Sequence, residues 1–222
     1  MILHITRAGF HREAGHPITY TQLIYGIMKQ LLTLAAALTL FVFSSTAQEV
    51  VWKLDKVHSN VLFTVRHLVI SEVTGKFKDF DVTLKAAEEN FSDASVQAVI
   101  TTASIDTENE NRDNHLRSDD FFNAQQFPEM TFVSTSMKKI SDTEYVLSGD
   151  LTIRDVTKPV TFNVTYLGMI EAGQFGTRTG WKATTTVNRF DYDLKWDRTI
   201  EAGGLVVGKD VTILLNLEFI KT

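Results

Sequence analysis

Apolar and polar residues alternate along most of the chain after residue 49. The stretch 59–68 shows the pattern clearly, because Val61, Phe63 and Val65 are separated by single residues. A period of two places alternate side chains on opposite faces of a β-strand. The pattern predicts eight or so strands, within residues 50–55, 59–68, 75–85, 92–105, 130–137, 145–153, 160–167, 180–187 and 211–220.

Strands with one apolar face each predict an all-β fold. A sheet of this size avoids exposed edges by closing on itself, so we expect an extended eight-stranded antiparallel β-barrel. A β-sandwich is the alternative. The interior of an eight-stranded barrel is either filled by side chains or able to hold one small ligand. Alternation fits both cases, so sequence leaves a hollow and a filled barrel open.

One stretch, residues 112–132, interrupts the strand pattern with dense charge. Ser118 precedes two acidic residues, which is typical of a helix start because a hydroxyl and negative charge stabilise free N–H groups. Pro128 then returns the chain to an extended form. We expect one short helical cap segment on the barrel. Its Phe121 and Phe122 either plug the core or also touch whatever the barrel encloses.

The front of the chain predicts a secretory signal peptide at residues 28–47. Lys29 precedes the largely apolar run 31–43, and small residues lead to cleavage near Ala47. That run is shorter than the roughly 20 residues that cross a membrane, so we expect no stable span after cleavage. Met28 is then the expected true start, residues 1–27 an upstream extension without a structural role, and 48–222 the secreted domain.

Charge and cysteine content exclude some functions. The chain has 22 basic and 27 acidic residues and no cysteine. The predicted secreted domain keeps 19 and 26 of these, a net charge of −7. Nucleic acid binding favours a basic face, so we expect no nucleic-acid partner. Thiol chemistry and cysteine-bound metals are excluded.

No group of residues predicts catalysis or a metal site. The segment 203–210 resembles a phosphate-binding loop, but Asp210 stands where a Ser or Thr is required. His58 and His67 lie nine apart and would face opposite sides of an uninterrupted strand. We expect no cofactor, no metal and no enzyme activity. An enzyme with His67 or His115 as general base is the alternative.

Some basic residues stand at predicted strand ends and turns, where they are able to meet an anionic head group at a barrel rim. Sequence alone favours plain solvated charge for them. They are Arg154, Lys158, Arg178 and Arg189.

A series of motifs, in this order and spacing, resembles the YceI-like family over nearly all of residues 50–222. The motifs are Trp52–Asp55, His58-Ser59, Phe63, His67, Gly75, Phe77, Arg112-Asp113, His115–Ser118, Phe121-Phe122, Phe127-Pro128, Leu151–Arg154, Val156–Val160 and Gly203–Gly208. Asp155 and the region Phe190–Tyr192 depart from the family pattern.

The resemblance implies a lipocalin-like barrel that sequesters or carries a long apolar ligand, a polyisoprenoid or another lipid chain. It also implies a periplasmic or secreted bacterial protein, often a homodimer, linked to stress or lipid handling. The implied apolar contacts are Phe63, Phe77, Phe121, Phe122, Phe132, Leu151 and Phe162, and the implied head-group contacts are His67, Arg117 and Arg154. A filled barrel with a structural or interaction role remains a further alternative.

Overall fold

The computed structural model describes residues 19–38, 48–201 and 203–222. The chain divides into two compact units, residues 1–46 and 47–222. The described part of the first unit is helix α1 (Tyr20–Leu38), which runs through Met28. Among the described residues, no helix is both long and apolar enough to cross a membrane. The predicted cleavage region around Ala47 lies outside the described residues, so the signal peptide stays a prediction.

The second unit is built of strands and short helical turns. Its strands are β1 (Val50–Leu54), β2 (Asn60–His67), β3 (Ser71–Phe77), β4 (Phe80–Ala86), β5 (Ser95–Thr101), β6 (Ile105–Asp106), β7 (Glu129–Lys139), β8 (Glu144–Ile153), β9 (Val156–Glu171), β10 (Thr177–Asn188) and β11 (Val207–Lys221). Its helical segments are α2 (Glu110–Arg117) and the 3₁₀ turns η1 (Lys56–His58), η2 (Thr102–Ser104), η3 (Gly173–Phe175) and η4 (Arg189–Tyr192).

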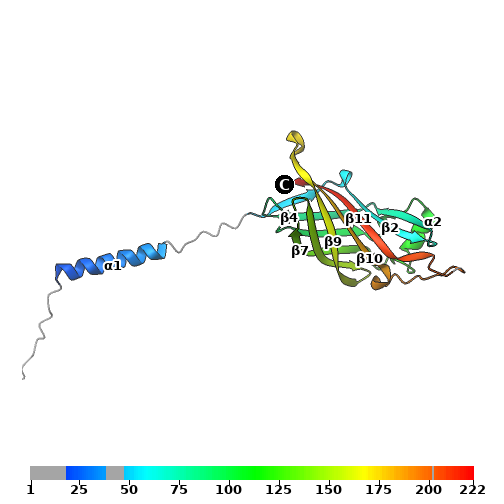
Figure 1. The fold of residues 1–222 in the computed structure, drawn as a ribbon, viewed down its shortest axis with the longest axis horizontal. Helices are drawn as coiled ribbons and strands as arrows, with labels where there is room; N and C mark the ends of the chain where they lie inside the picture. The colour runs from blue at the N-terminus through cyan, green and yellow to red at the C-terminus, as the bar shows by residue number, and fades with distance from the viewer. Residues whose placement is uncertain (1–18, 39–47, 202) are drawn as a thin grey trace, which may run out of the picture. The chain divides into compact units, whose positions relative to one another are not determined.

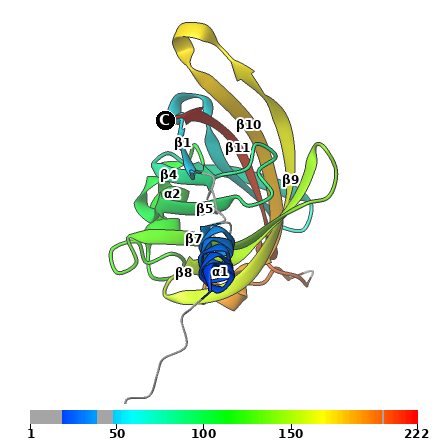
Figure 2. The ribbon, with the colours of Figure 1, turned by 90° about the vertical axis from the view of Figure 1, so that its left-hand side faces the viewer.

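These segments form eight antiparallel strands in a closed ring, which confirms the predicted barrel. Three of the eight are interrupted: β1 continues into β2, β3 into β4, and β5 into β6. Each composite strand pairs with the next along the chain, and β11 closes the ring by pairing with both β1 and β2. Figures 1 and 2 show the strands wrapped around a common interior.

The interruptions come from local hydrogen bonds that alternation does not reveal. The Asp55 carboxylate accepts the backbone N–H groups of Val57 and His58, which folds η1 between β1 and β2. His58 and His67 therefore do not lie on one uninterrupted strand. The predicted strands 75–85 and 92–105 were similarly too long, because each is broken by a bend or turn.

The cap helix is present, but the predicted start at Ser118 was wrong. Helix α2 begins after Asn109, whose side chain accepts the backbone N–H of Arg112 at 3.0 Å. Ser118 instead ends the helix, and its hydroxyl donates to the His115 carbonyl at 2.7 Å. The buried Asp113 accepts from both the backbone N–H and the hydroxyl of Thr107, which fastens the helix to the end of β6.

Packed aromatic rings fill the end of the barrel opposite α2. The Phe91 ring lies 5.5 Å from Trp52 and 5.0 Å from Trp181, centroid to centroid. Tyr145 and Tyr166 pack on Trp181 at 5.4 and 4.6 Å. Such offset and edge-on pairs stabilise beyond their buried area. The β4–β5 loop, through Phe91, therefore closes this end of the interior.

Among the described residues, the buried core lies in the second unit. A closed sheet and a core of its own are what a domain needs to fold independently. One hairpin extends beyond this domain. β9 pairs with β8 only as far as Thr165, and the β9–β10 hairpin rises past the barrel in Figure 2.

Candidate ligand-binding cavity

A cavity of about 190 Å³ lies inside the barrel. Its wall is formed by side chains of β2 to β5 and β7 to β11, together with residues of the cap and of the segment 189–194. In the described chain Arg189 is the one charged residue of the wall, and nearly all others are aliphatic or aromatic. The barrel is therefore hollow, and its interior has little to offer a polar ligand.

The cavity is long relative to its volume. On β11 its wall extends from Val207 to Phe219. Twelve residue steps of ~3.3 Å, on a strand tilted by about 40°, span roughly 30 Å along the barrel axis. Pockets for compact small molecules usually enclose about 300–1,000 Å³. A long cavity of smaller volume suits a thin chain better than a compact molecule.

The structure brings all seven predicted apolar residues to this wall. They are Phe63, Phe77, Phe121, Phe122, Phe132, Leu151 and Phe162. They come from β2, β3, β7, β8, β9 and the cap, so only the closed barrel brings them together. Contact with a ligand is a separate matter and stays a prediction.

The two neighbouring Phe residues of the cap pack against different aromatic rings. The Phe121 ring lies edge-on to His115 at 5.0 Å and near Trp196 at 5.5 Å. The Phe122 ring lies edge-on to Phe77 at 5.9 Å. Both rings also line the cavity. The pair therefore belongs to the core and to the cavity wall at once, which leaves both predicted roles open.

The three predicted head-group residues do not line the cavity. Arg117 donates to the carbonyls of Ala103 and Ile105 at 2.8 and 2.7 Å. Arg154 donates to the carbonyls of Phe121 and Asp193, both at 2.8 Å. These bonds tie the cap to the barrel. His67 ends β2, where its carbonyl accepts the Ser71 hydroxyl. A head-group role for His67, Arg117 and Arg154 stays a prediction.

Arg189 is the cation that the structure does place at the cavity. Its side chain is only 4% exposed, so the expectation of solvated charge was wrong for this residue. The guanidinium donates to the carbonyls of Gly208, Leu194 and Val207 and lies 4.3 Å from the Phe190 ring centroid. Burial lowers its pKa, because the charged form loses hydration.

The cavity wall also contains, among its described residues, a polar atom without a hydrogen-bond partner. The indole Nε1–H of Trp181 is buried and, among described residues, meets no hydrogen-bond acceptor. Trp181 lines the cavity at the end filled by aromatic rings. Leaving a buried donor unpaired costs about 1–3 kcal/mol, so a ligand oxygen or a water molecule at this end would be stabilised.

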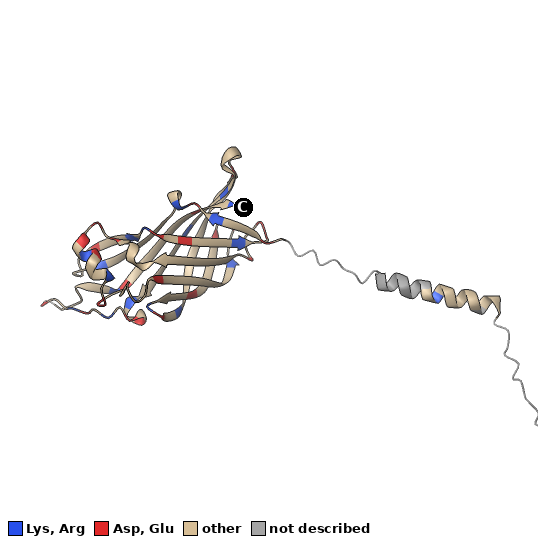
Figure 3. Cartoon of the chain, turned by 180° about the vertical axis from the view of Figure 1, so that it is seen from behind, with Lys and Arg blue, Asp and Glu red and all other residues tan. Residues whose placement is uncertain are grey.

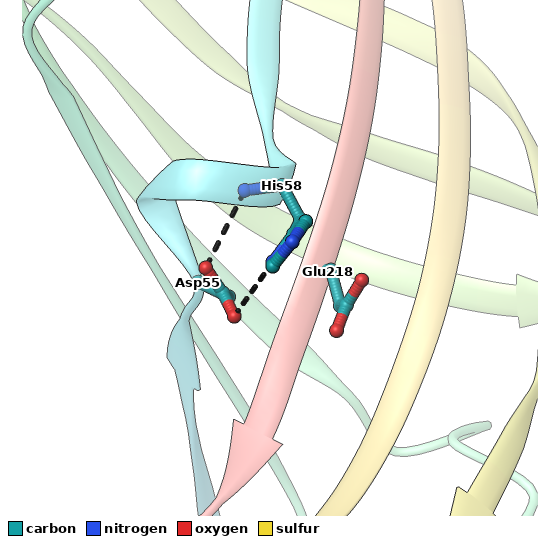
Figure 4. A group of neighbouring side chains, drawn as sticks. All are labelled: Asp55, His58 and Glu218. Carbon is teal, nitrogen blue, oxygen red and sulfur yellow. Dashed lines mark hydrogen bonds and ion pairs between the residues drawn. The ribbon is translucent and has the colours of Figure 1, made fainter. Parts of the chain in front are cut away.

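A cluster of possible metal ligands lies outside the cavity, near the base of the β9–β10 hairpin. Asp55, His58 and Glu218 place one ligand atom each within 4.8 Å of one another (Figure 4). The Arg178 guanidinium donates to both carboxylates. The hydrogen bond from Arg178 is the largest cause that lowers the pKa of Asp55 to about 2, and the hydrogen bond from His58 is the next largest. The guanidinium of Arg178 thus supplies the positive charge between the two carboxylates. The cluster acts as an ion-pair network that joins β1, β10 and β11.

A histidine–acid pair lies on the cap. His115 Nε2 is 2.7 Å from a carboxylate oxygen of Asp120. Neither side chain lines the cavity, and the alternative that the protein is an enzyme stays a prediction. On the side of the barrel seen in Figure 3, basic and acidic residues are interspersed.

The fold and cavity define a closed antiparallel barrel with an apolar interior, which is a binding-type fold. The model of the YceI-like domain matches residues 52–219. A UPF0312 protein of Staphylococcus epidermidis is 40% identical over 166 residues, covering 74% of this chain and 94% of that protein. A UPF0312 protein of Staphylococcus aureus is 39% identical with the same coverage. The chain belongs to the YceI-like family.

Solved structures share the fold. The Campylobacter jejuni YceI protein matches with a TM-score of 0.60 and 29% identity, over 69% of this chain and 87% of that one. Burkholderia cenocepacia BcnA matches with a TM-score of 0.65 and 22% identity, over 74% and 98%. A polyisoprenoid binding domain from Saccharophagus degradans matches with a TM-score of 0.55 and 15% identity, over 77% and 98%.

Proposed function

We propose that the barrel binds a long, narrow lipid of the polyisoprenoid class in its cavity and sequesters or carries it. The observation that carries this proposal is the apolar wall that continues from Phe219 to Val207. The Saccharophagus degradans domain, which bears the name of a polyisoprenoid binding domain and has the same fold, supports the choice of ligand class.

Chain length supplies the affinity in this proposal. Burying one CH₂ group is worth about 0.8 kcal/mol, so about 20 buried carbons contribute roughly 16 kcal/mol before costs. Association costs an estimated 4–15 kcal/mol. A short apolar molecule therefore binds weakly, whereas a chain that occupies the whole cavity binds usefully with few polar contacts.

The proposal gives the seven predicted apolar residues the role of chain contacts. Arg189 lies at the cap end of the wall, so an oxygen-bearing head group is proposed to lie there. Arg117 and Arg154 then act indirectly, by holding the cap in place through their bonds to backbone carbonyls.

We also propose secretion, with residues 28–47 as a signal peptide that is cleaved near Ala47. The support is the sequence pattern of a short positive start, an apolar run and small residues. Location in a bacterial periplasm or outside the cell, and a homodimer, are proposed on the resemblance to the family.

Neighbouring positions on β5 allow a matched test. Ala98 lines the cavity, whereas Val99 is 39% exposed on the outer face. Ala98→Phe fills part of the cavity, and Val99→Phe adds similar bulk outside it. We expect the domain 47–222 to retain radiolabelled geranylgeraniol through gel filtration. Ala98→Phe loses most of this retention with its circular dichroism unchanged, and Val99→Phe keeps it. Equal retention by both variants would refute binding inside the barrel.

A further inference from the structure

Three consecutive hydrophobic residues project from the turn between β2 and β3. Leu68, Val69 and Ile70, called the apolar tip below, are 37%, 52% and 88% exposed. Single exposed hydrophobic residues are ordinary on protein surfaces. Three in succession at the end of a hairpin are not, because polar and turn-forming residues usually occupy such positions.

The backbone of the apolar tip is unfavourable for the residues that it carries. Leu68 and Val69 have φ angles of +50° and +68°. Gly and Asn adopt this left-handed conformation readily, whereas for a β-branched residue such as Val it is a genuine outlier. Strained backbone of this kind persists where surrounding structure holds it, and it clusters at functional sites.

The β10–β11 loop holds the tip in this conformation. The Leu68 N–H donates to the Val206 carbonyl at 2.9 Å. A side-chain carbon of Val69 lies only 3.0 Å from the position that a Cβ at Gly204 would occupy, so glycine there admits the close approach. The fold therefore holds Leu68 and Val69 in a conformation that their own preferences do not favour, and the exposed Ile70 follows directly after them.

The apolar tip stands at the cap end of the cavity. His67, directly before the tip, pairs with Val207, and both Val207 and Val65 belong to the cavity wall. In Figure 1, β2 runs toward the end of the barrel where α2 lies, away from the C terminus. The aromatic rings fill the opposite end. The tip is thus continuous with the cavity wall at the cap end of the barrel.

We propose that the apolar tip inserts into the surface of a lipid bilayer and brings the cap end of the cavity against the membrane from which the ligand is taken. The role in loading rests on the proposed lipid-binding function, whereas membrane contact by the tip does not depend on it. A long-chain lipid resides in a bilayer, and aliphatic side chains without charge partition into one. Three such residues give weak, reversible attachment, which suits transfer better than permanent anchoring.

Because the backbone of the apolar tip is strained, a variant can be designed that weakens membrane contact without lowering the stability of the fold. Leu68→Asn together with Val69→Gly removes two apolar side chains and installs residues suited to positive φ. The domain 47–222 is mixed with phosphatidylcholine vesicles, without isoprenoid, and the vesicles are floated by centrifugation. We expect wild-type protein to float with them and the double variant to float at least fivefold less. The double variant unfolds at the same temperature as wild type or higher.

Phe175→Ser is the matched control, because Phe175 is 62% exposed on the β9–β10 hairpin at the other end of the barrel. This change removes an exposed hydrophobic side chain that lies far from the cap end, and we expect it to leave flotation unchanged. Wild-type protein that stays off the vesicles overturns the proposal, as does a double variant that floats equally well. The proposal is also overturned if the wild-type protein does not float but self-associates, and if the double variant no longer self-associates.

A second measurement separates this proposal from the proposed lipid binding. Geranylgeraniol is delivered either from ethanol or from the same vesicles. We expect the double variant to take up the lipid from ethanol at the wild-type level and from vesicles at least fivefold more slowly. Flotation without uptake from either source refutes lipid binding and leaves membrane contact standing. Uptake from vesicles at the wild-type rate refutes the role of the tip in loading.

Discussion

Replacing Arg189 by Met tests whether the buried guanidinium stabilises the cap end of the barrel. Met keeps much of the side-chain length and removes the charge and three hydrogen bonds to the carbonyls of Gly208, Leu194 and Val207. Hydrogen bonds of charged groups contribute about 1.5–3 kcal/mol each, which desolvation of the charge offsets by several kcal/mol. Carbonyls left unpaired in the interior add a cost of about 1–3 kcal/mol each.

We therefore expect Arg189→Met to lower the free energy of unfolding by about 3 kcal/mol. Urea unfolding followed by tryptophan fluorescence measures this change. With a slope of about 1–3 kcal/mol per M, the midpoint falls by roughly 1–3 M. Arg189→Lys recovers only part of the loss, because an ammonium group is a point charge that does not reproduce the fork of a guanidinium.

Arg66→Met is the chemical control, since Arg66 is exposed on β2. A surface change of this kind alters stability by about 0.5 kcal/mol or less. An unchanged midpoint in Arg189→Met would refute the reasoning, because it would mean that the lost bonds do no more than balance the cost of burying the charge.

Other sites give sharp expectations. Arg178→Met removes the cation that lowers the pKa of Asp55 to about 2. A depressed carboxyl pKa stabilises the fold above the unfolded-state pKa of ~3.9 and loses that effect as pH falls through the folded-state value. The free energy of unfolding of Arg178→Met should thus lie furthest below that of wild type above about pH 5. The difference should shrink between pH 4 and 2, and a difference independent of pH would contradict this. Gly75→Ala places a Cβ 2.3 Å from the Phe63 ring and 2.8 Å from Thr107. It should cost about 1–3 kcal/mol by overpacking and reduce isoprenoid uptake, as gel filtration would show, whereas uptake at the wild-type level would argue against Phe63 as a contact of the lipid chain.

The strands could be predicted because alternation is a local signal that barrel closure does not override. Where the structure differs, side chains made hydrogen bonds that a periodic pattern does not encode. Asp55 folds η1 between β1 and β2, and Asp93 accepts the N–H groups of Ala87 and Glu88, so that β5 starts late. Asn109 and Ser118 are both good helix-capping residues. In the structure Asn109 starts α2, and the Asp113 carboxylate bonds the helix to Thr107 at the end of β6.

The apolar half of the candidate site could be predicted, and its charged residue could not. Alternating Phe and Leu residues must face inward once the barrel closes, so Phe63 and Leu151 on distant strands meet at one wall. A basic residue at a strand end usually stays hydrated. Arg189 is buried because the loop after it folds back and supplies carbonyls from positions up to 19 residues away. No local pattern contains that information.

Native mass spectrometry tests the central claim most directly. The domain 47–222, incubated with geranylgeraniol and passed through gel filtration, is expected to carry one lipid for each barrel. The Ala98→Phe variant, folded but with part of its cavity filled, is expected to appear without lipid. A wild-type protein that shows only its own mass, or an Ala98→Phe variant that carries the lipid equally well, would contradict binding inside the barrel.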